Sequence, residues 1–234
     1  MLSQRTIKNK ITCSGVGLHT GKKVKLTFHP AEPNTGILFR RIDGDKVVDI
    51  PATAKNVGET TLSTTLVYGD YKISTIEHLL SALAGTGVDN CIIDCDGPEI
   101  PIMDGSSTQF VFLIQTAGIV EQNAVKKFVY VTKSVQVQRD DAVARIKPYD
   151  GFRVTFTLEF DHPVYNKYPH SASIDFSQTS FIREVSRART FGLMDDLEKL
   201  KKMNLALGAN LNNAIGIGDE DVLNEGGLRF ADEF

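Results

Sequence analysis

A glutamate directly followed by a histidine, Glu77-His78, is the part of this sequence whose residue types best suit hydrolytic chemistry. Imidazole is a common zinc ligand, and a neighbouring carboxylate can act as a general base on metal-bound water. On a helical wheel His78 lies opposite an apolar stripe and beside Ser81 and Gly85, which suits either solvent or a substrate cleft. The local pattern alone favours a simpler interpretation, a capping glutamate followed by a solvated histidine, because the HExxH spacing of zincins is absent.

A glycine-rich segment, Gly15 to Lys23, contains another histidine of interest, His19. Its glycines do not have the spacing of a phosphate-binding P-loop, and no Ser or Thr follows the lysine pair. We therefore interpret the segment as a turn into the next strand, from which His19 could still face a ligand. No two of the five histidines are spaced i, i+4, so no local pattern supplies a second metal ligand.

Two further polar positions have both a structural and a functional interpretation. Asp104 precedes a glycine and suits either a turn or a role in organising a site. Thr190 follows Arg187 and Arg189, two arginines that would complement the dipole at a helix C-terminus. The hydroxyl of Thr190 could instead donate a hydrogen bond to a developing oxyanion.

Apolar residues between 193 and 217 also leave two interpretations open. The set comprises Leu193, Met194, Leu197 and Leu200 at helical spacing, followed by Leu205, Leu207, Ile215 and Ile217 among glycines and asparagines. A buried core is the usual role of such residues, and a channel for an acyl chain would use the same types. Composition does not separate these alternatives.

Alternation of apolar and polar residues predicts strands around the candidate residues in the first half. The strands are expected at residues 23–28, 65–68, 71–74 and 91–95. Gly69-Asp70 lies between the second and third of these and predicts a hairpin. Cys91 and Cys95 would lie about 13 Å apart along the last strand, so we interpret them as buried thiols.

Two helices are predicted in the same half from capping patterns. Ser74 has capping-box spacing to Glu77, and Ser106 has it to Gln109. The second helix should end at Gly118. Residues 119 to about 127 are polar and charged, and predict a linker.

The second half repeats the pattern of strands followed by helices. Strands are predicted at residues 128–132, 135–138, 142–147 and 152–160, and helices at about 179–187 and 195–203. Alternation places Phe160 on the buried face of the last strand, and residues 228–234 look like the start of a further helix. The chain is therefore predicted to have an α+β fold of two similar domains, each a layer of β-sheet packed against helices.

The domains are expected at residues 1–122 and 123–234, the second incomplete. Composition limits the functions available to them. The net charge of -3 argues against nucleic-acid binding, including an RNA-binding domain of similar layering. The longest apolar run, Phe110 to Ile114, is too short for a transmembrane segment, and no secretory signal is visible. The odd cysteine count favours a cytoplasmic protein, and we expect a monomer.

The candidate segments occur together in a specific order. They are Gly15 to Gly21, Ser74 to Leu79, Pro98 to Ser106, Ser186 to Gly192, and Val222 to Phe234. With these segments the chain resembles the UDP-3-O-acyl-N-acetylglucosamine deacetylase family over its whole length. Each motif alone is weak, and the ordered set is highly specific.

The resemblance implies an active site between two domains, in which a zinc-bound water attacks the N-acetyl group of UDP-3-O-acyl-N-acetylglucosamine and acetate is released, as a step of lipid A synthesis. By position, His78 matches a zinc ligand, Glu77 the general base, and Thr190 the residue that holds the oxyanion. Residues of about 193–217 match the insert that forms the acyl passage, and Phe160 matches a position near the uridine. The implied substrate-binding residues are His19, Phe160, Phe191, Leu193, Met194, Leu197 and Leu207.

The resemblance also places the other ligands of the single zinc ion beyond Phe234, together with a general acid. Three protein ligands usually define a catalytic zinc site. We therefore expect the 234 residues alone to be inactive. The alternative hypothesis is a non-catalytic module that binds the UDP-acyl sugar.

Overall fold

A five-stranded sheet in the order β2-β3-β8-β4-β5 is the largest sheet in the computed structural model, which describes residues 2–234. Its strands are β2 (Ile11–Val16), β3 (Lys23–Pro30), β4 (Ile37–Asp43), β5 (Lys46–Pro51) and β8 (Cys91–Cys95). Strands β4 and β8 are parallel, and the other neighbours are antiparallel. Strand β3 buries Val24, Leu26 and Phe28 on one face, so the predicted alternation is confirmed.

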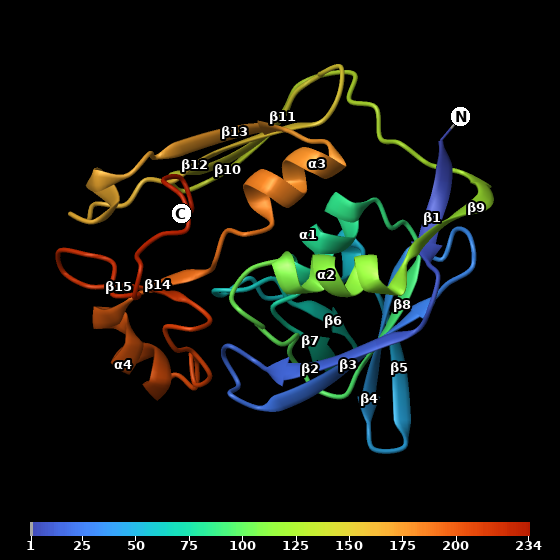
Figure 1. Cartoon of the computed structure of the whole chain (residues 1–234), viewed down its shortest axis with the longest axis horizontal. Coiled ribbons are helices and arrows are strands. Elements are labelled where there is room, and N and C mark those ends of the chain that lie inside the picture. Colours follow the sequence, from blue (N-terminus) through green and yellow to red (C-terminus); the bar gives the residue numbers. More distant parts are fainter. Residues whose placement is uncertain (1) are drawn as a thin grey trace.

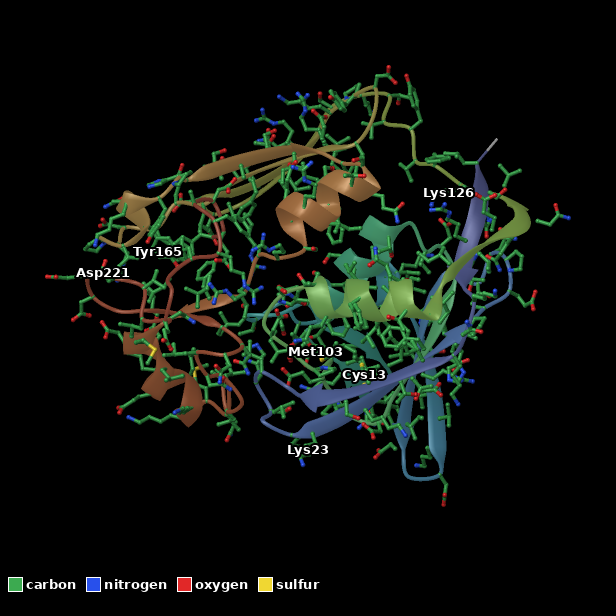
Figure 2. The ribbon with its side chains drawn as sticks, in the orientation of Figure 1. Cys13, Lys23, Met103, Lys126, Tyr165 and Asp221 are labelled. Atoms are coloured by element: carbon green, nitrogen blue, oxygen red, sulfur yellow. The ribbon has the colours of Figure 1, made fainter. Side chains whose placement is uncertain are left out.

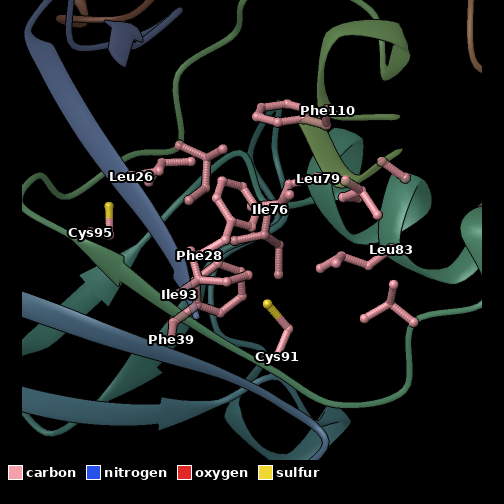
Figure 3. Packing of buried hydrophobic residues seen from close by; sticks show 14 of the residues in the cluster. Leu26, Phe28, Phe39, Ile76, Leu79, Leu83, Cys91, Ile93, Cys95 and Phe110 are labelled. Carbon is pink, nitrogen blue, oxygen red and sulfur yellow. The ribbon is translucent and has the colours of Figure 1, made fainter. Parts of the chain in front are cut away.

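Two ten-residue helices, α1 (Glu77–Thr86) and α2 (Thr108–Ala117), lie over one face of this sheet (Figure 1). The stripe of α1 packs onto the strands, and Figure 3 shows Leu79 and Leu83 close to Phe28 and Ile93. Helix α2 adds Phe110 to the same core. Burial of this apolar face stabilises the helices, because isolated helices of such length are marginal in water.

The shorter elements of the first half agree with most of the predictions. Strands β6 (Leu66–Tyr68) and β7 (Tyr71–Ile73) form the expected hairpin, with a turn at Gly69-Asp70, and the 3₁₀ helix η1 (Ala54–Asn56) precedes it. Helix α2 ends before Gly118, as predicted.

The predicted linker after α2 is wrong, because residues 119–125 form strand β9 (Ile119–Val125). It pairs antiparallel with β1 (Ser3–Ile7), so this segment joins the N-terminal half. Its polar residues lie on an edge pair, where every second side chain is open to water. Figure 2 labels Lys126 just beyond this pair, where its Nζ lies 3.0 Å from Asp89 Oδ1.

Two antiparallel hairpins begin the second half. Strand β10 (Val135–Arg139) pairs with β11 (Ala142–Ile146), and β12 (Arg153–Thr157) pairs with β13 (Ser171–Asp175). All three of the matching predicted strands are confirmed in place, although β12 is shorter than 152–160. Its predicted buried face is wrong, since every residue of β12 is exposed among the residues that the structure describes.

Residues 128–132 are not a strand, which corrects that prediction. Phe128, Val129 and Tyr130 are exposed, with 94% of the surface of Val129 open to solvent, and Val131 is only half-buried. A strand needs a hydrogen-bonded neighbour, and no partner for this segment lies within residues 2–234.

The C-terminal part of the chain combines short helices with a parallel strand pair. After the 3₁₀ helix η2 (Tyr165–Lys167), α3 (Gln178–Ser180) continues into the π-turn η3 (Phe181–Val185), which covers most of the predicted helix at 179–187. Strand β14 (Phe191–Leu193) pairs with β15 (Ile215–Ile217), and α4 (Met194–Lys202) lies between them in sequence. Residues 228–234 form turns, so the helix predicted there is wrong.

The second half has its own small cluster of buried side chains, Val164, Tyr165, Ile215 and Ile217. Phe181 instead packs into the first core, against Gly85 of α1. The α+β class is confirmed, and the division at residue 122 stays a prediction. No helix within residues 2–234 is long and apolar enough to cross a bilayer.

Candidate active site

The start of α1 places Glu77 and His78 in the first helical turn. The predicted capping box is wrong, since the N-cap position is Ile76 and no side chain caps it. Ser74 Oγ donates to the Pro98 carbonyl, while Glu77 Oε2 accepts from the Thr64 N–H at 3.0 Å. Glu77 is therefore not used as a capping residue, and its carboxylate points toward the neighbouring loop.

His78 is half-buried and follows directly in the helix. Burial lowers the pKa of its imidazole, against the opposing effects of the nearby carboxylates of Glu77 and Asp104. The lowered pKa favours the neutral ring, the form that binds metal ions. The carbonyl of His78 accepts hydrogen bonds from the hydroxyls of Ser81 and Ser107.

Asp104 organises the loop that faces His78. Its Oδ1 accepts from both the N–H and the hydroxyl of Ser106, and its Oδ2 accepts from Arg229 at 2.9 Å. Burial alone would raise the pKa of Asp104, but the hydrogen bonds from Arg229 and Ser106 outweigh it and hold the pKa below its usual value. Ser106 is thus engaged with Asp104, and Ser107 is the N-cap position of α2, one residue later than predicted.

Thr190 is tied to the same loop by its backbone. Its N–H donates to the Gly105 carbonyl at 2.8 Å, and its carbonyl accepts from the Ile215 N–H at 2.8 Å. Thr190 therefore lies between the Asp104 loop and the β14–β15 pair. This arrangement links Thr190 to His78 through Gly105, Ser106 and Ser107.

A buried ion pair next to Thr190 was missed by the sequence reasoning. Arg189 Nε donates to Glu233 Oε1 at 2.7 Å, and the two side chains are 9% and 0% exposed. Oε2 of Glu233 accepts from the backbone N–H of Arg229, and Nη1 of the Arg229 guanidinium donates to the carbonyl of Arg187. The sequence pattern favours a helix C-terminus for Arg187 and Arg189, and no local spacing indicates that Arg189 has a partner 44 residues away.

An apolar cavity of about 520 Å³ lies beside Thr190. Its volume falls within the range of small-molecule pockets. Seven of the predicted site residues line it, namely His19, Phe160, Thr190, Phe191, Leu193, Met194 and Leu197. Leu207 is 48% exposed and does not line this cavity, and the prediction that it binds substrate stays a prediction. Neither Glu77 nor His78 belongs to the wall.

His19 has both ring nitrogens engaged at the edge of this cavity. Nδ1 accepts from the Ala206 N–H at 3.4 Å, and Nε2 lies 3.3 Å from the Leu62 carbonyl. The ring orientation is thereby set by two segments far apart in the sequence. The prediction that His19 binds substrate stays a prediction.

Phe160 is 44% exposed and lies beyond the end of β12, so its expected burial on that strand is wrong. Its ring stacks on Tyr165 with centroids 4.9 Å apart, and Tyr165, labelled in Figure 2, forms the adjoining wall. The ring of Phe234 packs against Tyr165 and Phe191, with centroids 5.0 and 5.5 Å away. The aromatic part of the wall thus comes from Phe160, Tyr165 and Phe191, and Phe234 contacts the last two.

Comparison with known proteins decides the family of this chain. The family model described as UDP-3-O-acyl N-acetylglycosamine deacetylase matches residues 4–234. The chain belongs to this family. The UDP-3-O-acyl-N-acetylglucosamine deacetylase of Methylococcus capsulatus (strain ATCC 33009 / NCIMB 11132 / Bath) is 58% identical over 234 residues, which are 100% of this chain and 77% of that relative.

Membership of the deacetylase family raises the question of which residues here could hold zinc. His78 fits a ligand, because it is half-buried, has a lowered pKa and follows a carboxylate. Within residues 2–234, no group of three His, Cys, Asp or Glu side chains lies close enough together to hold a metal ion. The residues present therefore fit one ligand of a three-ligand site.

Proposed function

We propose that this chain serves the hydrolytic removal of the N-acetyl group from UDP-3-O-acyl-N-acetylglucosamine, a step of lipid A synthesis in the cytoplasm. The observation that carries the proposal is the connection between Glu77-His78 and Thr190. The Asp104–Ser107 loop joins the two, with Gly105 bonded to Thr190 and Ser107 to His78. The Glu77-His78 pair and the residue Thr190 of the cavity wall are thus both hydrogen-bonded to this loop through the backbone.

Each residue has a role that its surroundings support. His78 would hold a zinc ion, which when bound polarises the amide and activates water. Glu77 would act as the general base that accepts the proton of the attacking water. Thr190 would donate its hydroxyl hydrogen bond to the oxyanion of the tetrahedral intermediate.

The cavity supports the assignment of an acylated substrate. Its wall consists mostly of apolar side chains contributed by β14, α4 and the segment 206–216. A hydrocarbon chain gains free energy when it leaves water for such a wall, by about 0.8 kcal/mol for each buried CH₂. The acyl group of the substrate would lie here, with the amide toward Thr190.

Acetate release tests this function in two proteins. One is the 234-residue chain, and the other is a chimera that continues after Phe234 with the remainder of the Methylococcus capsulatus relative. With zinc and substrate the chimera should release acetate, and Glu77→Ala or His78→Ala should lower turnover by about 10²–10⁴. Unchanged turnover in the His78→Ala chimera would refute the assignment.

The 234-residue chain alone should release no more acetate than its own Glu77→Ala variant. A single protein ligand would hold zinc weakly, and no group of three potential ligands occurs within residues 2–234, which supports this expectation. Acetate release above that control would contradict this part of the proposal. Zinc binding followed by calorimetry should show the same difference between chain and chimera.

The alternative, a non-catalytic module that binds the UDP-acyl sugar, is favoured by one observation. The cavity is formed entirely by residues of this chain, whereas a three-ligand metal site is not present among residues 2–234. Two measurements separate this alternative from the deacetylase: calorimetry shows whether the protein binds the substrate, and the acetate assay shows whether the zinc-loaded chimera hydrolyses it. Binding by the chimera without acetate release would favour the module.

A further inference from the structure

Glu99 is a buried carboxylate that is not among the predicted site residues. It follows β8 in a stretch bounded by two prolines, and only 1% of its surface is exposed. A buried carboxylate is costly unless hydrogen bonds satisfy it. The donors that satisfy Glu99 therefore indicate what the residue does.

Four donors from two separate segments converge on this one carboxylate. Oε1 accepts from the His19 N–H at 2.8 Å and from the Thr75 hydroxyl at 3.1 Å. Oε2 accepts from the Thr20 N–H at 2.8 Å and from the Thr20 hydroxyl at 2.6 Å. Each carboxylate oxygen accepts two hydrogen bonds, and only Oε1 accepts from both segments.

The first segment is the start of α1. Thr75 has a φ of 59°, a left-handed conformation that is rare for a β-branched residue, and it is 2% exposed. Such a conformation persists only where the surroundings hold it, and here Ser74 also bonds to Pro98 and Ile100 on either side of Glu99. Thr75 precedes Glu77 and His78 by two and three positions, so its conformation sets the direction in which their helix begins.

The second segment is the turn between β2 and β3. A Cβ at Gly17 would lie 2.2 Å from Glu99 Oε2, so the turn approaches the carboxylate as closely as only glycine allows. The Glu99 bonds fix the backbone of His19, whose ring lies in the cavity wall. The position of that ring depends on the same carboxylate as the start of α1.

We propose that Glu99 is a positioning residue of the candidate active site, which holds the His19 turn and the start of the Glu77-His78 helix in one fixed relation. The proposal rests on the proposed function in one respect, namely that the residues positioned by Glu99 belong to an active site. The coupling itself is a property of the zinc-free chain. It can therefore be tested where no deacetylation occurs.

The substitution Glu99→Gln tests the coupling because an amide has only one acceptor oxygen. Whichever way the amide is turned, its NH₂ group faces a backbone N–H, of His19 or of Thr20, and leaves that donor buried and unpaired. The change preserves shape and size. It removes the bond pattern without creating a cavity.

Side-chain ¹H–¹⁵N spectra of the five histidines provide the readout. Glu99→Gln should shift the ring signals of both His19 and His78 and leave that of His29 unchanged. The matched control is Asp94→Asn, which removes a carboxylate on β8 whose Oδ2 lies 2.7 Å from the His29 ring. The control should shift His29 alone. A Glu99→Gln spectrum in which His78 does not move would overturn the proposal.

Hydrogen exchange provides a second readout of the same coupling. Exchange at His19, Thr20 and the first turn of α1 should become about tenfold faster together in Glu99→Gln, the factor for one hydrogen bond with a charged partner. Asp94→Asn should leave these amides unchanged. Faster exchange in the turn alone would contradict a role at the helix.

A pair of variants at Thr75 keeps the proposal open to refutation if Glu99→Gln fails to fold. Thr75→Val keeps the side-chain shape and removes the hydroxyl, and Thr75→Ser keeps the hydroxyl. The valine variant should shift the His19 signal, which lies across the carboxylate, and the serine variant should not. Equal spectra for both variants would refute the coupling. None of these results depends on zinc, so they stand or fall separately from the deacetylase assignment.

Discussion

The guanidinium of Arg189 and the carboxylate of Glu233 form a buried pair with Nε and Oε1 2.7 Å apart, and this pair adjoins Thr190 in the sequence. The second carboxylate oxygen accepts from Arg189 Nη2 and from the Arg229 N–H. Glu233 thereby attaches the segment that ends in Phe234 to the segment that bears Thr190. A carboxylate with 0% exposure has no water to replace these donors.

Removing one partner of this pair should destabilise the fold strongly. Glu233→Ala leaves the Arg189 guanidinium buried without its counter-charge, which costs about 3–5 kcal/mol of the free energy of unfolding. Urea denaturation measures the loss. Asp175→Ala removes the exposed Arg153 pair, whose side chains are 48% and 58% exposed, and should change the free energy of unfolding little, because water screens the two charges. Similar losses in the two variants would contradict the role of burial.

Gly105 should not tolerate a side chain. Its φ is +87°, and a Cβ would lie 2.3 Å from the backbone oxygen of Asn213. Gly105→Ala should cost more than about 2 kcal/mol, because backbone must move in addition to the strain of a positive φ. Gly44→Ala is the matched control, with a φ of +61° and open space around the added carbon, and should cost about 1 kcal/mol. Equal costs would show that the loop moves freely.

The three thiols should react slowly in the native protein. Burial raises the pKa of Cys13 to about 11, of Cys91 to about 12 and of Cys95 to about 11. Since the thiolate is the reactive form, labelling with a disulfide reagent near pH 8 should be slow until denaturant is added. Rapid labelling of Cys91 or Cys95, which are fully buried, would contradict this prediction, and the half-buried Cys13 should be the first to react as denaturant is added.

The same raised pKa values predict a loss of stability in alkali. The folded thiols keep their protons where unfolded thiols, with a pKa of 9.0, lose them. The contribution is therefore fully present below about pH 9 and is lost as the pH rises toward 11 and 12. Urea midpoints measured across this interval should fall, and fall less in a Cys91→Ala variant.

Tyr165 should gain stability when its hydroxyl is removed. Among the described residues that hydroxyl is buried and has no hydrogen-bond partner, and burial raises the pKa of Tyr165 well above its usual range. Tyr165→Phe should raise the free energy of unfolding by about 1 kcal/mol, because the desolvation penalty is relieved. Tyr68→Phe, at an exposed ring, should have no effect. A loss of stability in Tyr165→Phe would reveal a partner for the hydroxyl.

The elements that sequence could predict are those stabilised by their own periodic pattern. The alternation of β3 and the apolar stripe of α1 state which face is buried, and both agree with the structure. The capping box at Ser74 failed because Thr75 has a positive φ, which a local pattern does not reveal. The Glu77 carboxylate instead accepts a hydrogen bond from the Thr64 N–H, a tertiary contact that a local sequence pattern does not predict.

The same distinction applies to the candidate site. Seven cavity residues were found by type and by resemblance, since each lies in a recognisable segment. Glu99, Arg229 and Glu233 were missed because each has a side-chain partner far away in the sequence, namely Thr75, Asp104 and Arg189, at separations of 24, 125 and 44 residues. Charged residues at such separations carry no spacing that identifies a partner.

The contacts that place His19 beside Ala206 have a consequence for the order of folding. They join residues 187 positions apart, so a very long loop must close before they form. The pairs β2–β3 and β6–β7 join residues close together in the sequence, so we expect them to form before these contacts. The cavity is then a late product of the folding reaction, and brief heating or mild denaturant should empty it of a bound acyl probe well before the sheet unfolds.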